Sequence, residues 1–455
     1  MDIQKTIQIQ NAFFQTNKTK DIEFRINALK TLRQGIIKHE ENILSALKLD
    51  LNKAPMEAIM TEIGIVTSEL DHMLKHIRHW AKPKKVKTPF MLIAASSKVI
   101  YEPYGVVLIM SPWNYPFQLA IDPLIGAIAA GNCAVVKPAS YAKHTSDAIK
   151  LMLDECFPPE YITTILGGRE ENTLLLEQKF DYIFFTGSTA VGKTVMEKAS
   201  RFLTPVSLEL GGKSPCIVDG TMDLKLTAKR LAFGKFINAG QTCVAPDYVF
   251  VKKEYKSALI DALKNVITEF FGPDPVHNPD FPKIINNKHL RRLVDLMRDQ
   301  SIAIGGDYTE TSIAPTILDE VSLEDPIMQE EIFGPILPVM AFEDIAEVIA
   351  YVKSKPRPLA LYLFSNDKKM QNRIFSEISF GGATLNDTIM HVASSELAFG
   401  GVGDSGMGSY HGIHSFTTFS HAKSILHRKN WLDLDFRYHP YSKSKQKLIE
   451  IFTKK

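Results

Sequence analysis

The first eighty residues of the chain carry apolar residues at helical spacing. Leu29, Leu32 and Ile36 fall on one face of a helix, and lysine and arginine residues lie between them. Residues 44–51 continue an amphipathic pattern, and residues 63–80 form another. We therefore predict N-terminal helices that pack against the rest of the molecule through one apolar face.

Beyond residue 105 the pattern changes to short apolar runs that alternate with helical stretches. The runs occupy residues 106–110, 133–136, 162–166, 182–185 and 206–210. Strands that alternate with helices predict a parallel sheet with helices on both faces. Such sheets bind ligands at the carboxyl ends of their strands.

A second α/β segment extends from about residue 211 to residue 398. We expect strands at residues 215–218 and 248–251, and helices at residues 225–239 and 255–271. A strand at residues 99–102 and a β-like segment at residues 415–426 belong to neither α/β segment. The pattern as a whole predicts an α/β protein with two such units.

Charge and composition exclude several classes of protein. The chain has 53 basic and 51 acidic side chains, a net charge of +2, which argues against nucleic acid as its main partner. We find no run of about 18 apolar residues, so no transmembrane helix is predicted. The polar start does not resemble a signal peptide, and the four cysteines show no disulfide or metal spacing. We expect a cytoplasmic protein with reduced thiols and no metal.

Two residues are candidates for covalent and acid–base chemistry. Cys243 follows small residues in the segment Asn-Ala-Gly-Gln-Thr-Cys, where a thiol could be exposed and reactive. Taken alone, the pattern favours a buried structural cysteine, which is also our interpretation of the other three. Glu209 ends an apolar strand before two glycines; partial burial there would raise its pKa and suit a general base. A salt-bridged strand end is an equal alternative.

Three further motifs could bind a ligand. The strand that ends at Gly187 is followed by Ser188 and a helix, whose N-terminus favours a phosphate. Asn114 follows another strand and could donate to an oxyanion, while Glu331 precedes Ile-Phe-Gly-Pro and could accept from ribose hydroxyls. Each motif also has a structural interpretation: an N-cap serine, a turn asparagine and an ordinary loop acid.

Together these motifs resemble the aldehyde dehydrogenase superfamily. The segments Phe-Thr-Gly-Ser-Thr, Leu-Glu-Leu-Gly-Gly-Lys-Ser-Pro, Asn-Ala-Gly-Gln-Thr-Cys-Val-Ala-Pro-Asp and Glu-Glu-Ile-Phe-Gly-Pro occur in the family's order. The resemblance covers roughly residues 20–425 and is strongest to the class 3 branch of fatty and aromatic aldehyde dehydrogenases. The short N-terminus and the glycine-rich residues 399–412 carry that finer match.

The resemblance implies a fold and a domain organisation. It implies a Rossmann-like NAD(P)-binding domain, an α/β catalytic domain and a small β bridging or oligomerisation arm. The expected boundaries are 1–80 and 103–210 for the NAD(P)-binding domain, 211–398 for the catalytic domain, 81–102 and 413–430 for the arm, and 431–455 for a basic C-terminal tail. A homodimer is expected by the same resemblance.

The resemblance also implies an NAD(P)-dependent oxidation of an aldehyde to a carboxylic acid. Cys243 would attack the aldehyde, Asn114 and a backbone N–H at residue 243 would stabilise the oxyanion, and Glu209 would activate water to hydrolyse the thioester. Rival functions are a CoA-acylating aldehyde dehydrogenase and a non-catalytic protein on the same fold. The presence of Glu209 speaks against the first, since acylating relatives commonly lack this base.

The cofactor expected from the resemblance is NAD or NADP. Its binding residues would be Trp113, Lys137, Ser140, Gly187, Ser188, Gly192, Glu331 and Phe333. Many NAD-preferring relatives have glutamate in place of Ser140, where its charge repels a 2′-phosphate. A serine cannot repel that phosphate, so we expect NADP to be accepted at least as well as in glutamate-bearing relatives.

The substrate pocket is expected to suit a medium or long aliphatic, or an aromatic, aldehyde. Candidate walls on family analogy are Tyr115, Phe233, Ile389, Met390 and His391, although ordinary core packing explains any one of them equally well. The lysine-rich residues 441–455 are too short and too charged to span a membrane. We expect a solvated or subunit-contacting tail rather than peripheral membrane contact.

Overall fold

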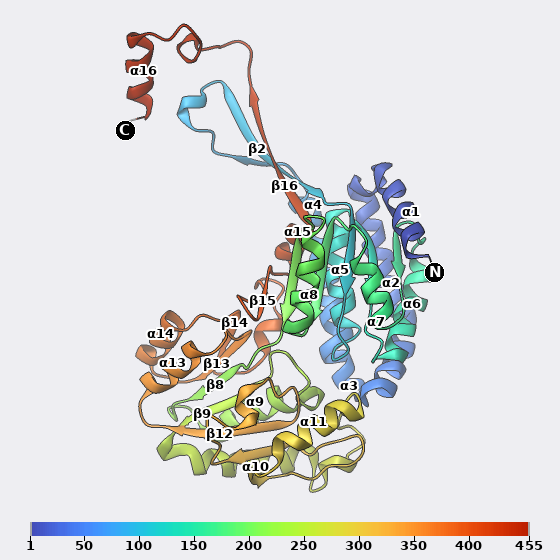
Figure 1. The fold of residues 1–455 in the computed structure, drawn as a ribbon, viewed down its shortest axis with the longest axis vertical. Helices are drawn as coiled ribbons and strands as arrows, with labels where there is room; N and C mark the ends of the chain where they lie inside the picture. Colours follow the sequence, from blue (N-terminus) through green and yellow to red (C-terminus); the bar gives the residue numbers. More distant parts are fainter. Residues whose placement is uncertain (1, 454–455) are drawn as a thin grey trace.

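The computed structural model describes residues 2–453 and contains three sheets that belong to three parts of the molecule (Figure 1). A six-stranded and a seven-stranded sheet each form the centre of an α/β unit. A three-stranded sheet extends from the first unit as a long arm, and the C-terminal helix lies near the end of this arm (Figure 1).

The six-stranded sheet contains the five apolar runs found in the sequence. Its order is β15-β7-β6-β3-β4-β5, and all neighbours are parallel except the pair of β15 with β7. The bounds are β3 Val106–Met110, β4 Cys133–Lys137, β5 Ile162–Thr164, β6 Tyr182–Gly187, β7 Val206–Leu210 and β15 Gly406–Met407. Most of these side chains are buried because helices cover both faces of the sheet.

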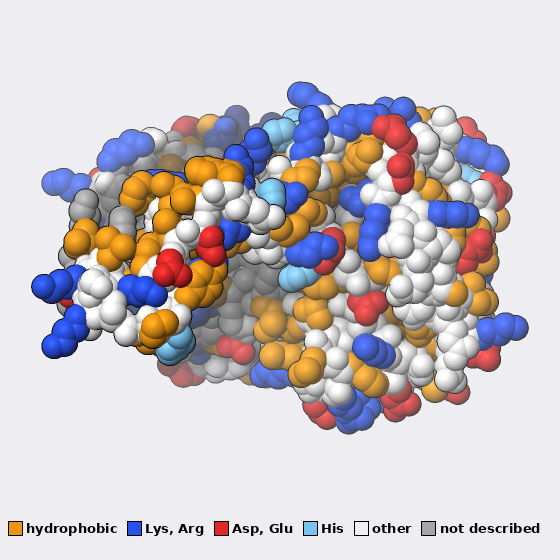
Figure 2. All heavy atoms as spheres, turned by 90° about the horizontal axis from the view of Figure 1, so that it is seen from above, with side chains coloured by type: hydrophobic (Ala, Val, Ile, Leu, Met, Phe, Trp, Pro, Cys, Tyr) orange, Lys and Arg blue, Asp and Glu red, His pale blue; other side chains and the backbone are white. Residues whose placement is uncertain are grey.

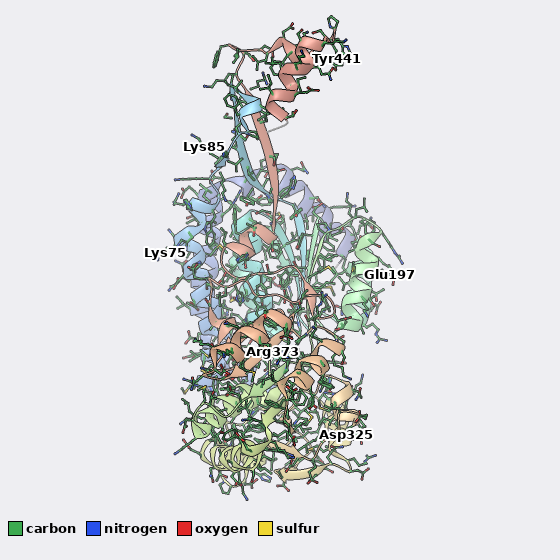
Figure 3. All side chains as sticks on the ribbon, turned by 90° about the vertical axis from the view of Figure 1, so that its left-hand side faces the viewer. Lys75, Lys85, Glu197, Asp325, Arg373 and Tyr441 are labelled. Atoms are coloured by element: carbon green, nitrogen blue, oxygen red, sulfur yellow. The ribbon has the colours of Figure 1, made fainter. Side chains whose placement is uncertain are left out.

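Helices from the N-terminal half surround this sheet. Their bounds are α1 Ile3–Gln15, α2 Ile22–Leu51, α4 Gly64–Trp80, α5 Gln118–Ala130, α6 Lys143–Cys156, α7 Arg169–Leu176 and α8 Thr189–Ser200. The long helix α2 begins where the carboxylate of Asp21 accepts from two backbone N–H groups, and it ends at Asn52, whose φ is 56°. Figure 3 shows Lys75 of α4 and Glu197 of α8 on opposite outer sides of this unit.

The seven-stranded sheet has the order β10-β11-β12-β9-β8-β13-β14. Its strands are β8 Pro215–Val218, β9 Tyr248–Lys252, β10 Ser301–Ile304, β11 Thr316–Asp319, β12 Ile336–Phe342, β13 Ala360–Phe364 and β14 Gly382–Leu385. Its longer helices are α9 Leu224–Phe236, α10 Lys256–Phe271, α11 Asn287–Met297, α13 Ile345–Ser354 and α14 Lys368–Glu377. The chain passes between the two large sheets directly, because only residues 211–214 separate β7 from β8.

The arm consists of β1 Lys84–Val86, β2 Ala95–Pro103 and β16 Ser420–Arg428. The expected β-like segment at 415–426 is partly wrong, since α15 spans Ile413–Thr418 and the strand starts only at residue 420. Phe416 is buried in α15 and packs against Trp80 and Tyr101, which explains the helical turn. This contact is tertiary and is not visible in the sequence pattern.

The free end of the arm exposes apolar side chains. Trp431, Tyr441 and Ile451 are 71%, 67% and 62% exposed, and Figure 2 shows hydrophobic atoms gathered there with lysine and arginine side chains at the rim. Residues 443–453 form helix α16 (Lys443–Thr453), while the last two residues of the expected tail lie outside the described residues. No helix among the described residues is long and apolar enough to cross a bilayer.

Candidate functional site

The strand order of the six-stranded sheet marks one edge as a ligand site. The chain adds β4 and β5 on one side of β3, and then β6 and β7 on the other side. Loops that leave β3 and β6 therefore diverge at their carboxyl ends, which opens a crevice. Asn114 follows β3 and Ser188 follows β6, so this sheet edge brings two of the predicted motifs together.

Cys243 lies in a loop between α9 and β9 that has an unusual backbone. Asn238, Ala239 and Gly240 adopt φ values of 52°, 51° and 71°, the left-handed region. This conformation costs energy for residues other than glycine, so the surrounding structure must hold it. At Gly240 a Cβ atom would lie 2.3 Å from the carbonyl oxygen of Gly334, which explains the glycine in this motif.

Two buried amide side chains hold this loop. The Nδ2 of Asn238 donates to the carbonyl oxygens of Asn114 at 2.7 Å and Gln241 at 3.1 Å. The Nε2 of Gln241 donates to the carbonyls of Asn238 and Lys283, both at 3.0 Å, and its Oε1 accepts from the N–H of Ile285 at 3.0 Å. The Asn and Gln of the cysteine motif thus fix the loop that presents Cys243.

Asn114 lies beside this loop. Its side-chain Nδ2 donates to the carbonyl oxygen of Gln241 at 3.0 Å, and the residue is 3% exposed. A primary amide carries two N–H groups, so a second donor remains for another acceptor. This geometry places an amide donor next to the backbone that leads to the thiol of Cys243.

Glu209 is the penultimate residue of β7 and is 2% exposed. Neither oxygen of its carboxyl group has a hydrogen-bond partner among the described residues. Loss of solvent raises the pKa of Glu209 well above its ordinary value. The alternative of a salt-bridged strand end is wrong, and a buried acid without a partner is instead available to a ligand or to water.

The thiol of Cys243 is not a preformed thiolate. Desolvation, with a smaller effect from the neighbouring Glu331 and Glu209, raises its pKa to about 12. The residue is partly exposed rather than open to solvent, which differs from the exposed thiol that the small neighbouring residues suggested. The sulfur therefore lies in a site that is largely shielded from solvent.

Two cavities meet at Cys243. The first is lined by polar and apolar residues that include Trp113, Asn114, Gly187, Ser188, Glu209, Cys243, Glu331 and Phe333. The second is lined mainly by apolar residues that include Met60, Ile65, Tyr115, Phe233, Cys243, Ile389, Met390 and Val392. Leu119, Cys243, Phe399 and Tyr410 belong to both. The thiol can thus be approached from two chemically different sides.

The first cavity contains the features expected of an anion-binding and hydroxyl-binding cleft. Ser188 occupies the N-cap position of the twelve-residue helix α8, but its side chain makes no capping hydrogen bond. Capping by the hydroxyl group therefore does not explain the serine at this position. The carboxyl group of Glu331 packs against Gly211, where a Cβ atom would lie 2.1 Å from its Oε2. The other oxygen, Oε1, has no hydrogen-bond partner among the described residues. Burial raises the pKa of Glu331 to about 8. Phe333 stands edge-on to the ring of Trp113 at 5.4 Å.

Three predicted cofactor residues lie away from the lining of this cavity. Gly192 lies on α8 against β7, where a Cβ would lie 2.6 Å from Leu210, so it lets the helix pack closely. The Nζ of Lys137 donates to the carbonyls of Pro138 and Gly167 at 2.9 and 2.8 Å. Ser140 is exposed in the turn after β4.

The predicted pocket walls are mostly found in the second cavity. Tyr115, Phe233, Ile389 and Met390 line it, and the hydroxyl of Tyr115 lies 2.6 Å from the Oγ1 of Thr242. His391 is not among its lining residues. Its ring instead stacks on Phe399 and bonds to Thr384 at 2.9 Å, and desolvation lowers its pKa to about 4.

The structure also adds residues that the sequence reasoning missed. Lys53 and Glu62 form a fully buried ion pair beneath Asn114, and Lys235 is a fully buried lysine behind the cysteine loop. Charged side chains are ordinarily exposed, so nothing in the local pattern marks these three residues. Among residues 2–453, no group of three or more His, Cys, Asp or Glu side chains is arranged to hold a metal.

Comparisons with known proteins agree with this site. The model of the aldehyde dehydrogenase family matches residues 1–425. The chain is 48% identical to 4,4'-diaponeurosporen-aldehyde dehydrogenase of Staphylococcus aureus over 99% of both chains. It is 42% identical to aldehyde dehydrogenase family 3 member A2 of Macaca fascicularis, over 97% of this chain and 92% of the relative.

A solved structure has the same fold throughout. The substrate-bound AldH of Staphylococcus aureus superposes with a TM-score of 0.97 at 47% identity, covering 99% of each chain. The comparisons confirm the predicted α/β fold with a Rossmann-like and a catalytic unit, the class 3 resemblance, and an NAD(P)-dependent oxidoreductase acting on an aldehyde. The chain belongs to the aldehyde dehydrogenase family.

Proposed function

We propose that this aldehyde dehydrogenase oxidises an apolar aldehyde, of medium or long aliphatic chain or aromatic, to the carboxylic acid with Cys243 as nucleophile. The position of Cys243 at the junction of the two cavities carries this proposal. One cavity offers a carboxyl group, an amide and a helix N-terminus, while the other offers mainly apolar walls. The aldehyde would reach Cys243 through the apolar cavity, and the oxidant would lie in the polar cavity on the other side of the thiol.

The first step forms a bond between sulfur and carbon. The sulfur of Cys243 loses its proton to solvent through the cleft and attacks the aldehyde carbon. The carbonyl oxygen becomes an oxyanion, which accepts from the Nδ2 of Asn114 and from the backbone N–H of Cys243. The Gln241 carbonyl that receives the other amide hydrogen of Asn114 keeps this donor oriented.

The first cavity fits NAD or NADP. Gly187 and Ser188 at the start of α8 would hold the pyrophosphate, the partnerless Oε1 of Glu331 would accept from the nicotinamide ribose, and Phe333 and Trp113 would provide the walls. When bound, the cofactor supplies the two-electron oxidant that converts the thiohemiacetal of Cys243 into its thioester. Gly192 supports this site indirectly by seating α8.

The adenosine end of the cofactor would reach Lys137 and Ser140. Two of the three ammonium hydrogens of Lys137 bond to carbonyls, so one remains for a ribose hydroxyl. Ser140 is exposed and carries no charge that would repel a 2′-phosphate. We expect NADP to be used at least as well as by relatives with glutamate here. A comparison of kcat/KM for both cofactors tests this, with Ser140→Glu expected to shift the preference toward NAD.

The second half of the reaction hydrolyses the thioester. Glu209 takes a proton from water, which attacks the acyl carbon, and the same two donors stabilise the second oxyanion. The C–S bond then breaks, and the acid and the thiol of Cys243 are released. The raised pKa of Glu209 suits it to hold the proton that it removes from water.

The apolar substrate class follows from the second cavity. Met60, Ile65, Phe233 and Val392 surround the approach to the thiol, and the part of the chain that the structure describes places no arginine or lysine in the lining of this cavity. Such walls gain free energy by burying hydrocarbon and offer no counterion to a phosphorylated aldehyde. The relative that is 48% identical is named for a diaponeurosporen-aldehyde, which agrees with an apolar substrate.

Production of NAD(P)H at 340 nm from hexanal, a long-chain aldehyde and benzaldehyde tests the proposal, beside a Cys243→Ala control. Turnover that disappears in the control supports it. Formation of acyl-CoA that depends on added coenzyme A would establish the acylating rival instead. Lack of turnover with all three aldehydes, together with no acyl-CoA when coenzyme A is added, would favour a non-catalytic protein.

The domain boundaries and the oligomeric state complete the proposal. The six-stranded unit, residues 1–80 and 103–210, would bind the cofactor, and residues 211–398 would carry the nucleophile. Strand β15 belongs to the six-stranded sheet although it lies outside both ranges. The arm and its exposed apolar end would contact a second copy to form a homodimer in the cytoplasm. Light scattering of the purified protein tests the dimer.

A further inference from the structure

A buried ion pair lies under the oxyanion site. The Nζ of Lys53 donates to the Oε1 of Glu62 at 2.5 Å, and both side chains are 0% exposed. Removing two charges from water costs about as much free energy as their mutual attraction returns. A pair of this kind is weak as a source of stability, so its contacts must be considered for another role.

The ion pair makes hydrogen bonds to the segment that carries Asn114. The Nζ of Lys53 also donates to the carbonyl oxygen of Asn114 at 3.1 Å and lies 4.0 Å from the ring centre of Tyr115. The Oε2 of Glu62 accepts from the N–H groups of Phe117 and Gln118 at 2.8 and 3.1 Å. The ion pair therefore holds both ends of a five-residue segment, residues 114–118.

The same carbonyl connects the pair to the cysteine loop. The carbonyl oxygen of Asn114 receives the Nδ2 of Asn238 as well as the Nζ of Lys53. Tyr115, beneath the ammonium group, bonds through its hydroxyl to Thr242, which precedes Cys243. Lys53 thus contacts the residue that carries one proposed oxyanion donor, Asn114, and is linked to the residue before the other, Cys243, only through Tyr115.

The local backbone explains how these charges reach the site. Lys53 follows the left-handed Asn52 at the end of α2, and Glu62 belongs to a π-helical turn, Ile59–Ile63. Such turns are frequent at functional sites because they shift side chains out of the regular helical register. Glu57, just before this turn, accepts from the N–H of Asn238 at 2.9 Å. The corner between residues 52 and 63 therefore supports both loops.

We propose that Lys53, held by Glu62, is a positioning residue for the oxyanion site and acts through the carbonyl group of Asn114. It fixes the peptide on which the Asn114 side chain is mounted, and it touches neither aldehyde nor cofactor. This inference rests on the proposed role of Asn114. Loss of the pair is expected to lower kcat about tenfold to a hundredfold, a part of the effect of losing an oxyanion donor, with little change in KM.

The test uses paired substitutions that leave no charge unpaired. Lys53→Met/Glu62→Met removes the donor to Asn114, whereas Lys53→Gln/Glu62→Gln keeps an amide donor at residue 53. Each pair is made in the wild-type and the Asn114→Ala backgrounds, and kcat, KM and thermal unfolding are measured. Lys235→Met is the matched control for loss of a fully buried ammonium group without a bond to Asn114.

The proposal expects the methionine pair to lower kcat in the wild-type background and to have no further effect in Asn114→Ala. The glutamine pair should retain most of the activity. Equal losses in both backgrounds, or no loss in the wild-type background, would overturn the role of Lys53. An Asn114→Ala enzyme with wild-type kcat would overturn the oxyanion role of Asn114 itself, and the route through Lys53 with it. If the methionine pair does not fold, the glutamine pair provides the test. It keeps a donor at residue 53, so loss of its activity would also contradict the proposal.

Discussion

The side-chain Nδ2 of Asn114 lies 3.0 Å from the carbonyl oxygen of Gln241, two residues before the nucleophile. These residues come from different units, since Asn114 follows the first strand of the six-stranded sheet and Gln241 precedes a strand of the seven-stranded sheet. The hydrogen bond therefore links the two units close to the sulfur of Cys243. A small shift between the units would change both oxyanion donors together.

Substitution of Asn114 by alanine should lower kcat about 10² to 10³-fold, because one donor to the oxyanion is lost. The KM should change little, since the donor acts mainly on the transition state. Steady-state kinetics with a medium-chain aldehyde measure this. Asn114→Asp is the matched isosteric control; it accepts rather than donates and should be no better than alanine.

Substitution of Glu209 by glutamine should separate the two halves of the reaction. Formation of the thioester does not require activated water, so a burst of NAD(P)H equal to the enzyme concentration should precede a steady rate lowered about 10² to 10⁴-fold. Stopped-flow absorbance at 340 nm shows the burst, and mass spectrometry of the quenched protein shows the acyl group on Cys243. A proportional loss of the burst rate and the steady rate would assign Glu209 to the first step instead.

Alkylation of Cys243 in the cofactor-free enzyme should speed up with pH without reaching a plateau below pH 10. The reactive form is the thiolate, and desolvation with the charges of Glu331 and Glu209 holds the pKa of the thiol at about 12. Above pH 8, where Glu331 becomes charged, Glu331→Gln should label faster than wild type because one repelling charge is gone. A plateau near pH 8 in the wild-type enzyme would contradict the shielded thiol.

Lys235→Met should stabilise the fold at neutral pH. The ammonium group is fully buried and has no hydrogen-bond partner within residues 2–453, and desolvation lowers its pKa from 10.5 to about 8. Between these two values the unfolded chain binds more protons, so wild-type stability rises with pH across this window, and the full penalty is present below pH 8. The gain in Tm of the variant should thus be largest at pH 7 and shrink toward pH 10. A gain that is independent of pH would point to packing rather than charge.

Much of the architecture is readable from local pattern. The five buried runs of the first sheet appear where the sequence places them, because a strand covered on both faces must be almost continuously apolar. Asn114, Glu209 and Cys243 are also visible in the sequence, since each follows or ends such a run or lies among turn-forming residues. Local sequence thus determines which chemical groups are available and at which ends of strands they lie.

Only the tertiary structure decides how these groups act. Glu209 and Cys243 line one cavity because residues 211–214 connect a strand of one large sheet directly to a strand of the other, a relationship that no local pattern contains. Burial then turns an apparently exposed thiol into one with a pKa of about 12. The charged pair of Lys53 and Glu62, polar by every local rule, becomes interior because Asn114 and its neighbours close over it. Solvation and long-range contact are properties of the folded chain, so they are set only when distant segments meet.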